Sequence, residues 1–274
     1  MVKALKTPKT PNRLDELIDA LVVLRLPVMA DALRMEVQKG PPEGDTRLDY
    51  LWRLVEPQLC RRRENAIARR IQLARFPALK SLDGFDFDFQ PHLDRDLVFE
   101  LATLDFLRRG QNALFGGMSG TGKSHIAISL GYLACADGFR VRYTTSADML
   151  ANLYASLATH SLTQALQPFL RCQLLIIDEV GLDSAERDTS KDAGLFYKVV
   201  QHRYDNGAST VITTNIDWQC WGEYLGGDSV ATSAILDRLI HCGYAITIDG
   251  PSWRAEEHKR LNQRPHKDHD PLEH

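Results

Sequence analysis

The chain has 274 residues, 44% of them hydrophobic and 25% charged, with a net charge of −3. This composition supplies enough apolar material for one large domain or a core domain with an appendage, and the charge excludes a polycation. No apolar run approaches the roughly 20 residues that span a bilayer, and the five scattered cysteines contain no C-x-x-C pair, which argues against a disulfide framework or a zinc site. We therefore expect a cytoplasmic protein with no membrane partner.

Both ends of the chain are polar. Residues 1–12 combine lysine and proline with little that can pack, so we expect a disordered basic tail. Residues 259–274 are interpreted as a polar tail, and its last three residues look like the scar of an expression tag.

A small helical module is predicted over residues 13–78. Leucine and isoleucine recur at three- and four-residue spacing between Leu14 and Leu24, the pattern of an amphipathic helix. A second helix is predicted from Val28 to Gln38, and a third starts near Thr46. A kink at Pro57 is expected before the helix resumes and continues to Phe76.

The third predicted helix carries a cluster of arginines. Between residues 61 and 75 there is one acid, Glu64, against six arginines. On a helix several of them share a broad face, which suits sequence-tolerant, salt-sensitive contacts with DNA phosphates. A solvated basic helix, or docking on an acidic neighbouring subunit, fits the same residues. The candidate DNA-binding residues are Arg61, Arg62, Arg63, Arg69 and Arg70.

Residues 80–98 are predicted as a loop with three alternating aromatic residues, Phe85, Phe87 and Phe89. They are able to stack on nucleic-acid bases, but core packing is the expected role. A helix is predicted from Leu97 to Arg109, leading into the first strand.

From Asn112 onward, predicted strands alternate with predicted helices. This alternation indicates an α/β fold, with a five-stranded parallel sheet flanked by helices on both faces, over residues 79–258. The strands are expected at Asn112–Gly117, Arg140–Thr145, Leu174–Asp178, Thr210–Thr214 and Ala245–Ile248. The helices are expected at Ser124–Ala136, Ser146–Leu157, Lys191–Asp205 and Thr232–Ile240.

The loop after the first strand matches the phosphate-binding pattern G-x-x-x-x-G-K-[ST] at every fixed position. Its glycines let backbone N–H groups point at phosphate oxygens, and the following helix adds its positive dipole end. Lys123 is expected to reach the β- and γ-phosphates, and the Ser124 hydroxyl to ligate Mg²⁺. The predicted nucleotide-binding residues are Gly117, Ser119, Gly120, Thr121, Gly122, Lys123, Ser124 and His125.

The third strand ends in two acids, Asp178 and Glu179, about 50 residues after the phosphate loop. Ligands bind at the carboxyl ends of strands in such sheets. Asp178 is therefore predicted to hold Mg²⁺, directly or through water, and Glu179 to polarise a water for attack on the γ-phosphate.

Further polar residues follow the later strands. Asn215 comes directly after a β-branched strand and is predicted to orient the attacking water. Arg238, on an amphipathic helix, and Arg254, after the last strand, are candidates for cations at the γ-phosphate, and Arg203 is a third. Each arginine also fits a surface salt bridge.

Together these elements resemble an AAA+ ATPase, and more closely the IstB-like ATP-binding proteins of insertion sequences, which are related to DnaC-like helicase loaders. The resemblance covers roughly residues 13–255. The segments that carry it are Leu104–Leu107, Gly120–Ala127, Leu175–Gly181, Thr213–Asn215, Trp221–Glu223, Ala234–His241 and Gly250–Arg254.

The resemblance implies a protein that binds ATP and Mg²⁺ and assembles on duplex DNA into a homo-oligomer. It also implies assistance to a DDE transposase in target selection and DNA transposition, with DNA-stimulated ATP hydrolysis. By the same resemblance, Asn215 is expected to be the first sensor and Arg254 the second sensor, which acts in cis. Arg238 is expected to be the arginine finger, which acts on the ATP of a neighbouring subunit. Many relatives have Pro-Pro inside the phosphate loop and end it Lys-Thr, where this chain has Met118-Ser119 and Lys123-Ser124.

Two other functions fit parts of the sequence. A helicase loader of the DnaC-like class would use the N-terminal module to hold a protein instead of duplex DNA. A small-molecule kinase would share the phosphate loop, but Glu179 and Asn215 in their positions, and the absence of an evident arginine-rich lid, argue against it.

Overall fold

The computed structural model describes residues 13–40, 42–182, 191–241 and 243–262. The predicted tail at residues 1–12 lies outside the described residues, and so does the tail predicted at residues 259–274 from residue 263 on. Residues 259–262 are helical, which corrects the predicted start of that tail. The chain divides into two compact units between Arg69 and Arg70, and each is described by itself.

The N-terminal unit is helical, as predicted. Its helices are α1 (Arg13–Val23), α2 (Pro27–Lys39) and α3 (Arg47–Ala74), the last of which continues into the second unit. Pro57 has no amide hydrogen for the carbonyl of Arg53, yet α3 is helical through this position without interruption. The helices bury a small apolar core, made of Ile18, Leu21, Ala30, Ala32, Leu33 and Leu54.

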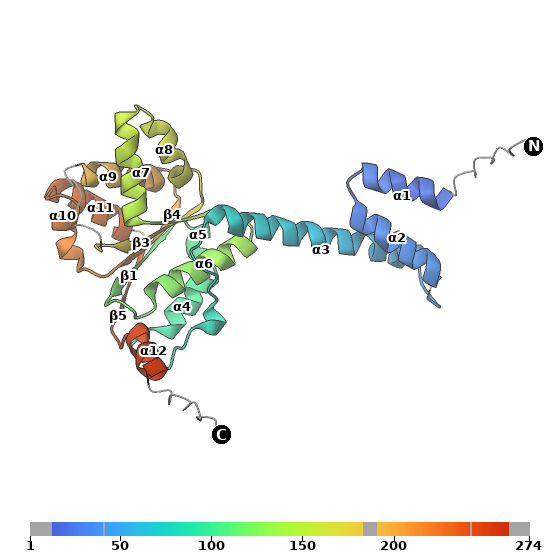
Figure 1. Cartoon of the computed structure of the whole chain (residues 1–274), viewed down its shortest axis with the longest axis horizontal. Helices are drawn as coiled ribbons and strands as arrows, with labels where there is room; N and C mark the ends of the chain where they lie inside the picture. The colour runs from blue at the N-terminus through green and yellow to red at the C-terminus, as the bar shows by residue number, and fades with distance from the viewer. Residues whose placement is uncertain (1–12, 41, 183–190, 242, 263–274) are drawn as a thin grey trace, which may run out of the picture. The chain divides into compact units, whose positions relative to one another are not determined.

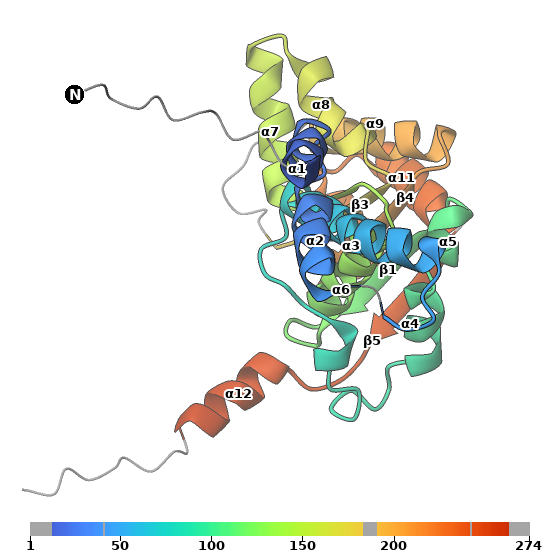
Figure 2. The ribbon, with the colours of Figure 1, turned by 90° about the vertical axis from the view of Figure 1, so that its right-hand side faces the viewer.

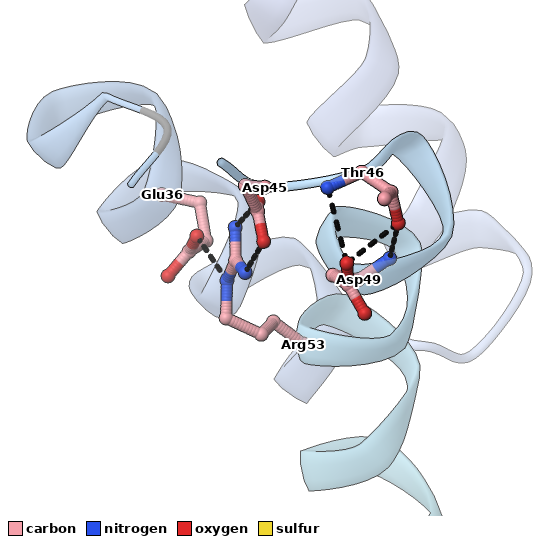
Figure 3. Close-up of polar contacts among 5 residues, drawn as sticks. All are labelled: Glu36, Asp45, Thr46, Asp49 and Arg53. Atoms are coloured by element: carbon pink, nitrogen blue, oxygen red, sulfur yellow. Dashed lines mark hydrogen bonds and ion pairs between the residues drawn. The ribbon is translucent and has the colours of Figure 1, made fainter. Parts of the chain in front are cut away.

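The start of α3 is fixed by polar side chains (Figure 3). The backbone N–H of Thr46 donates to Asp49 Oδ2 at 3.0 Å, and the N–H of Asp49 donates to Thr46 Oγ1 at 3.2 Å, so each residue satisfies the other's amide. One turn later, Arg53 donates to both carboxylate oxygens of Asp45, at 2.8 and 2.5 Å, and to Glu36 at 2.8 Å. These bonds tie the end of α2 and the α2–α3 connection to α3.

The start of α2 is capped from a distance. Its N-cap residue, Leu26, has no side-chain oxygen to offer. Instead, Gln58 of α3 is buried, and its Oε1 accepts from the backbone amides of Val28 and Met29 at 3.1 and 3.3 Å. Two amides at the first turn of α2 are therefore satisfied by α3.

The second unit contains a parallel sheet of five strands, as predicted, in the order β2-β3-β4-β1-β5. The strands are β1 (Asn112–Gly117), β2 (Val141–Thr145), β3 (Leu174–Val180), β4 (Ser209–Thr214) and β5 (Gly243–Ile248). The central strands β1, β3 and β4 are almost entirely buried, which explains why they read as continuous apolar or β-branched runs.

Helices cover both faces of this sheet (Figure 1). One face packs on α4 (Arg95–Ala102), α5 (Asp105–Arg108) and α6 (Lys123–Ala136). The other face packs on the remaining core helices. These are α7 (Ser146–Ala158), α8 (Leu162–Leu170), α9 (Asp192–Asp205), α10 (Trp221–Tyr224) and α11 (Ser229–His241). After β5 comes α12 (Trp253–Asn262), which projects away from the sheet (Figure 2).

The structure corrects several predicted boundaries. The single helix expected from Leu97 to Arg109 is two helices, α4 and α5, because Leu104 takes a left-handed conformation with φ 64° that ends the helix. β3 continues to Val180, two residues beyond its predicted end. The sequence interpretation did not include α8, α10, α12 or the two short 3₁₀ turns η1 (Leu82–Gly84) and η2 (Trp218–Cys220).

Among the described residues, no helix combines the length and the apolar character needed to cross a membrane.

Candidate functional site

A cavity of about 670 Å³ opens in the second unit beside the loop between β1 and α6 and the carboxyl ends of β3 and β4. The structure brings most of the predicted site residues together there. The predicted residues that line it are Ser119, Gly120, Thr121, Gly122, Lys123, Ser124, His125, Asp178, Glu179, Asn215 and Arg254.

The loop itself needs its glycines for two reasons. Gly117, Gly120 and Gly122 have φ of 137°, 83° and 100°, a region that other residues rarely adopt. A Cβ at Gly117 would collide with the carbonyl of Ile248 in β5, and one at Gly120 with the side chain of Ser252. Gly117 does not line the cavity, so its role is to let the loop approach β5.

Lys123 is folded over this loop and buried. Its Nζ donates to the carbonyl oxygens of Gly117 at 2.8 Å and Met118 at 2.7 Å. Burial lowers the pKa of the Lys123 ammonium to about 8, with the Arg254 cation adding to this effect against the opposing carboxylates of Asp178 and Glu179. A cation at the first turn of a helix that follows a glycine-rich loop is suited to a phosphate group.

Asp178 is the most firmly held polar group of the cavity. Its Oδ1 accepts from Ser124 Oγ at 2.8 Å and from the hydroxyl of Thr213, and its Oδ2 accepts from the Tyr143 hydroxyl at 2.6 Å. Burial and the bond to Asp178 raise the pKa of Tyr143, which therefore stays a donor. The carboxylate is 2% exposed and directed at the first turn of α6.

Glu179 has an unusual backbone. Its φ is 60°, in the left-handed region that residues other than glycine seldom adopt. The pairing of β3 with β4 shifts between Ile177 and Val180, a bulge that lies at this residue. The backbone amide of Glu179 donates to Thr213 Oγ1 at 3.0 Å, and the residue lines the cavity.

One further segment binds the phosphate loop, and a second packs on that segment. The amide of Trp253 donates to the carbonyl of Gly120 at 3.0 Å, which places Arg254, on the first turn of α12, at the cavity. Gln90 Nε2 donates to the carbonyl of Pro251 at 2.8 Å, and the ring of Phe89 meets that of Trp253 edge-on at 5.0 Å.

The expected core packing of the aromatic residues is confirmed for Phe85 and Phe87. Both pack against the core beneath α4 and α6, and their rings meet at 4.8 Å. Phe85 also contacts the ring of His125 edge-on at 5.3 Å. His125 Nε2 lies 2.8 Å from the carbonyl of Ser81, so this nitrogen carries the proton.

Two of the three candidate arginines lie away from the cavity. Arg238, on α11, places its guanidinium 5.2 Å from the ring of Tyr197 and 5.9 Å from that of Tyr204, and it donates to the carbonyl of Ala234 at 2.8 Å. It lines a separate hollow of about 530 Å³ formed along one face of α11.

The prediction that Arg203 could supply a cation at the γ-phosphate is wrong. It is 1% exposed, and all five of its N–H groups are used inside the chain. The acceptors are Thr210 Oγ1 and the carbonyls of Phe169, Cys172, Gln173 and Ser209. This arginine binds the segment before β3 and the first two residues of β4.

The five candidate DNA-binding arginines all lie on α3, in different surroundings. Arg61, Arg62, Arg63 and Arg69 are exposed, and Arg61 pairs with Glu64 at 3.4 Å. Arg62 donates to the carbonyl of Arg25 at 3.4 Å. Arg70 is half-buried and donates to the carbonyl of Cys135, at the end of α6, at 3.3 Å. Arg70 therefore has a structural bond within the second unit.

Sequence reasoning missed two residues that hold Asp178, namely Tyr143 and Thr213. Both lie on the strands that flank β3, at its carboxyl end. No local motif marks Tyr143, and Thr213 lies in a segment that carries the family resemblance without pointing to Asp178. Only the strand order β2-β3-β4 brings both residues beside the acid.

The fold and the phosphate loop define the class: this is a P-loop protein with the α/β fold of AAA+ ATPases. The fold resembles that of DnaI, with 20% identity and a TM-score of 0.50 over 66% of this chain and 92% of that one. It also resembles a primosome component from Streptococcus pyogenes serotype M3, at 17% identity and a TM-score of 0.51 over 69% of this chain and 98% of that one.

The family follows from the sequence matches. Residues 20–261 match the model of the IstB-like ATP binding proteins. An ATP-binding protein of insertion sequence IS5376 from Geobacillus stearothermophilus is 34% identical over 89% of this chain and 95% of its own length. Another, of IS21 from Pseudomonas aeruginosa, is 35% identical over 77% and 78%. The chain belongs to the family of IstB-like ATP-binding proteins, as its motifs predict.

Proposed function

We propose that this protein is an ATPase that assembles with ATP on duplex DNA and assists the DDE transposase of its insertion sequence in target selection and DNA transposition. The observation that carries the proposal is the cavity in which Lys123, Asp178 and Glu179 meet. Membership of a family whose relatives are named for insertion sequences supplies the biological setting.

The residues of the cavity fit a nucleotide with Mg²⁺. The cradle at Gly120 and Gly122 has no room for side chains, and its backbone amides with the Lys123 ammonium suit phosphate oxygens. Mg²⁺ prefers oxygen ligands. The Ser124 hydroxyl oxygen and an Asp178 carboxylate oxygen lie 2.8 Å apart at this site and supply two of them. Bound Mg²⁺ would neutralise charge on the transferred phosphoryl group.

Glu179 and Asn215 have the hydrolytic roles. Both line the cavity near the phosphate loop, at the ends of neighbouring strands. In this proposal the Glu179 carboxylate accepts a proton from the attacking water, and the amide of Asn215 orients that water. A carboxylate in this position distinguishes an ATPase from a kinase, whose acceptor brings its own hydroxyl.

In this proposal, Arg254 and Arg238 act on the ATP of different subunits. Arg254 lines its own chain's cavity, which suits a sensor acting in cis. Arg238 does not line that cavity, and this suits a finger that reaches the ATP of a neighbouring subunit. The protein is then a homo-oligomer whose active sites are completed between copies.

DNA binding is assigned to the helical domain of residues 13–78, ahead of the ATPase domain of residues 79–258. The exposed Arg61, Arg63 and Arg69, with Arg62, supply phosphate contacts along α3. Arg70 contributes least, because its guanidinium already binds the Cys135 carbonyl.

The test is ATP hydrolysis with and without duplex DNA across a salt series, with particle size followed by light scattering. We expect DNA to stimulate hydrolysis, ATP to drive growth into large particles, and both effects to weaken steeply with salt. Hydrolysis that duplex DNA does not stimulate, or that prefers single strands and lacks such assembly, would favour the helicase loader instead.

A charge-matched pair of variants tests the arginine assignment. Arg61→Ala/Arg63→Ala should lose DNA stimulation and reduce the salt dependence, whereas Arg34→Ala/Arg47→Ala removes two exposed arginines elsewhere in the same unit and should behave as wild type. Equal effects of the two pairs would show that Arg61 and Arg63 have no particular role.

A further inference from the structure

The bulge between β3 and β4 gives Thr213 a special place. Ile177 pairs with Ile212, and the next pair is Val180 with Thr214. Two residues of β3, Asp178 and Glu179, therefore stand opposite the single residue Thr213. One is the proposed holder of Mg²⁺ and the other the proposed base.

The Thr213 hydroxyl bonds to both of them. It donates its proton to Asp178 Oδ1 and accepts from the backbone amide of Glu179 at 3.0 Å. The side chain is 1% exposed, so water does not compete for either bond. A hydroxyl is the side-chain group that makes such a bridge, because it is donor and acceptor at once.

The two acids depend on this hydroxyl to different degrees. Asp178 also accepts from Ser124 and Tyr143, so it remains held when Thr213 is altered. Glu179 has a left-handed backbone that costs free energy and persists only where its surroundings enforce it. The bond to its amide is one such restraint.

We propose that Thr213 is a positioning residue, which fixes the left-handed backbone of Glu179 and so aims its carboxylate into the cavity. This inference rests on the proposed role of Glu179 as the base. Thr213 lines the same cavity, and in this scheme it acts through Glu179 and makes no bond to the nucleotide or to the attacking water.

Three variants separate positioning from folding. Thr213→Val keeps the shape and removes the hydroxyl, whereas Thr213→Ser keeps the hydroxyl. Thr210→Val is the matched control, because it removes another fully buried hydroxyl of β4, one that accepts from Arg203 far from the proposed chemistry. ATP affinity, the Mg²⁺ concentration at half-maximal rate, kcat and the melting temperature are measured for each full-length variant.

We expect Thr213→Val to lower kcat by about tenfold to a hundredfold, the effect of misplacing a catalytic group by roughly 1 Å. ATP affinity and the Mg²⁺ requirement should stay within about threefold, because the phosphate loop and Asp178 keep their contacts. Thr213→Ser should restore kcat, and Thr210→Val should change the melting temperature without changing kcat.

The decisive measurement adds Thr213→Val to Glu179→Gln. If Thr213 acts through Glu179, the double variant hydrolyses ATP no more slowly than Glu179→Gln alone. A further loss that multiplies the two effects would overturn the inference, as would a wild-type kcat for Thr213→Val or a failure of Thr213→Ser to restore it.

The same set distinguishes this inference from the proposed function. If Glu179→Gln hydrolyses ATP at the wild-type rate, Glu179 is not the base, and the proposed role of Thr213 is overturned as well. Loss of hydrolysis in Glu179→Gln beside normal hydrolysis in Thr213→Val leaves the ATPase proposal standing and overturns the inference alone. If Thr213→Val does not fold, kcat in Thr213→Ala at its own folded fraction answers the question.

Discussion

At the scale of single residues, we expect Lys123 to make nucleotide binding depend on pH. Its ammonium is buried, and its pKa is lowered to about 8 in the protein without nucleotide. Phosphate oxygens favour the charged form, so binding should raise this pKa again. The group is therefore protonated before and after binding below pH 8, and takes up a proton on binding above it.

We predict that ATP affinity is nearly constant from pH 7 to 8 and falls above that, by up to about tenfold per pH unit. Titration calorimetry in two buffers of different ionisation enthalpy should show proton uptake at pH 9 and little at pH 7. Affinity that is flat to pH 9.5 would mean that Lys123 keeps its proton throughout.

A second prediction concerns Glu179 alone. Glu179→Gln keeps the size of the side chain and removes its basicity, so the variant should bind ATP normally and lose hydrolysis by about 10²- to 10⁴-fold. Because hydrolysis is proposed to reset assembly, light scattering should show large particles that persist after ATP addition. Particles that disperse as fast as those of wild type would separate hydrolysis from disassembly.

At the scale of elements, the start of α2 in the N-terminal unit is capped by a side chain of another helix, α3. Gln58 Oε1 accepts from two amides at the start of α2, and the side chain is buried. Gln58→Met keeps the volume and removes the acceptor, so we predict a loss of about 1–3 kcal/mol of local stability. Faster hydrogen exchange of α2 amides would show it, with the exposed Gln38→Met as the control.

Most elements of the second unit were predictable because their burial is simple. β1, β3 and β4 are covered on both faces, so their residues form apolar or β-branched runs that end at glycine or polar residues. The break before α5 was not predictable. It depends on a left-handed backbone at Leu104, a buried leucine, and nothing in its side chain favours that conformation.

The candidate site divides in the same way. The phosphate loop and the acid pair are local motifs, and the structure places Lys123, Ser124, Asp178 and Glu179 at one cavity. The bulge at Glu179 arises from the pairing of β3 with β4, two strands separated by a helix in the sequence. The bulge could not be predicted from the sequence, because it depends on the strand order, which no local motif contains.

At the scale of the whole molecule, the position of Arg238 makes a prediction about mixtures of subunits. Its guanidinium packs on Tyr197 and Tyr204 and does not line its own chain's cavity. We predict that Arg238→Ala binds ATP with unchanged affinity but hydrolyses it about 10³-fold more slowly, the typical effect of losing an arginine finger.

Mixing supplies the check. Lys123→Ala is expected to lose nucleotide binding but keeps Arg238, whereas Arg238→Ala keeps its cavity. If the finger acts between subunits, the two inactive proteins should recover hydrolysis when mixed, and Arg238→Ala mixed with itself should not. A mixture without activity leaves the action in trans unsupported.

The left-handed backbone of Glu179 sets activity against folding stability. Glycine is the residue that adopts φ near 60° without penalty, whereas a residue with a Cβ pays roughly 1–2 kcal/mol there. Glu179→Gly should therefore fold at least as stably as wild type while losing the proposed base. Replacing Glu179 by glycine would therefore exchange the proposed base for folding stability, so activity and stability make opposite demands on this position.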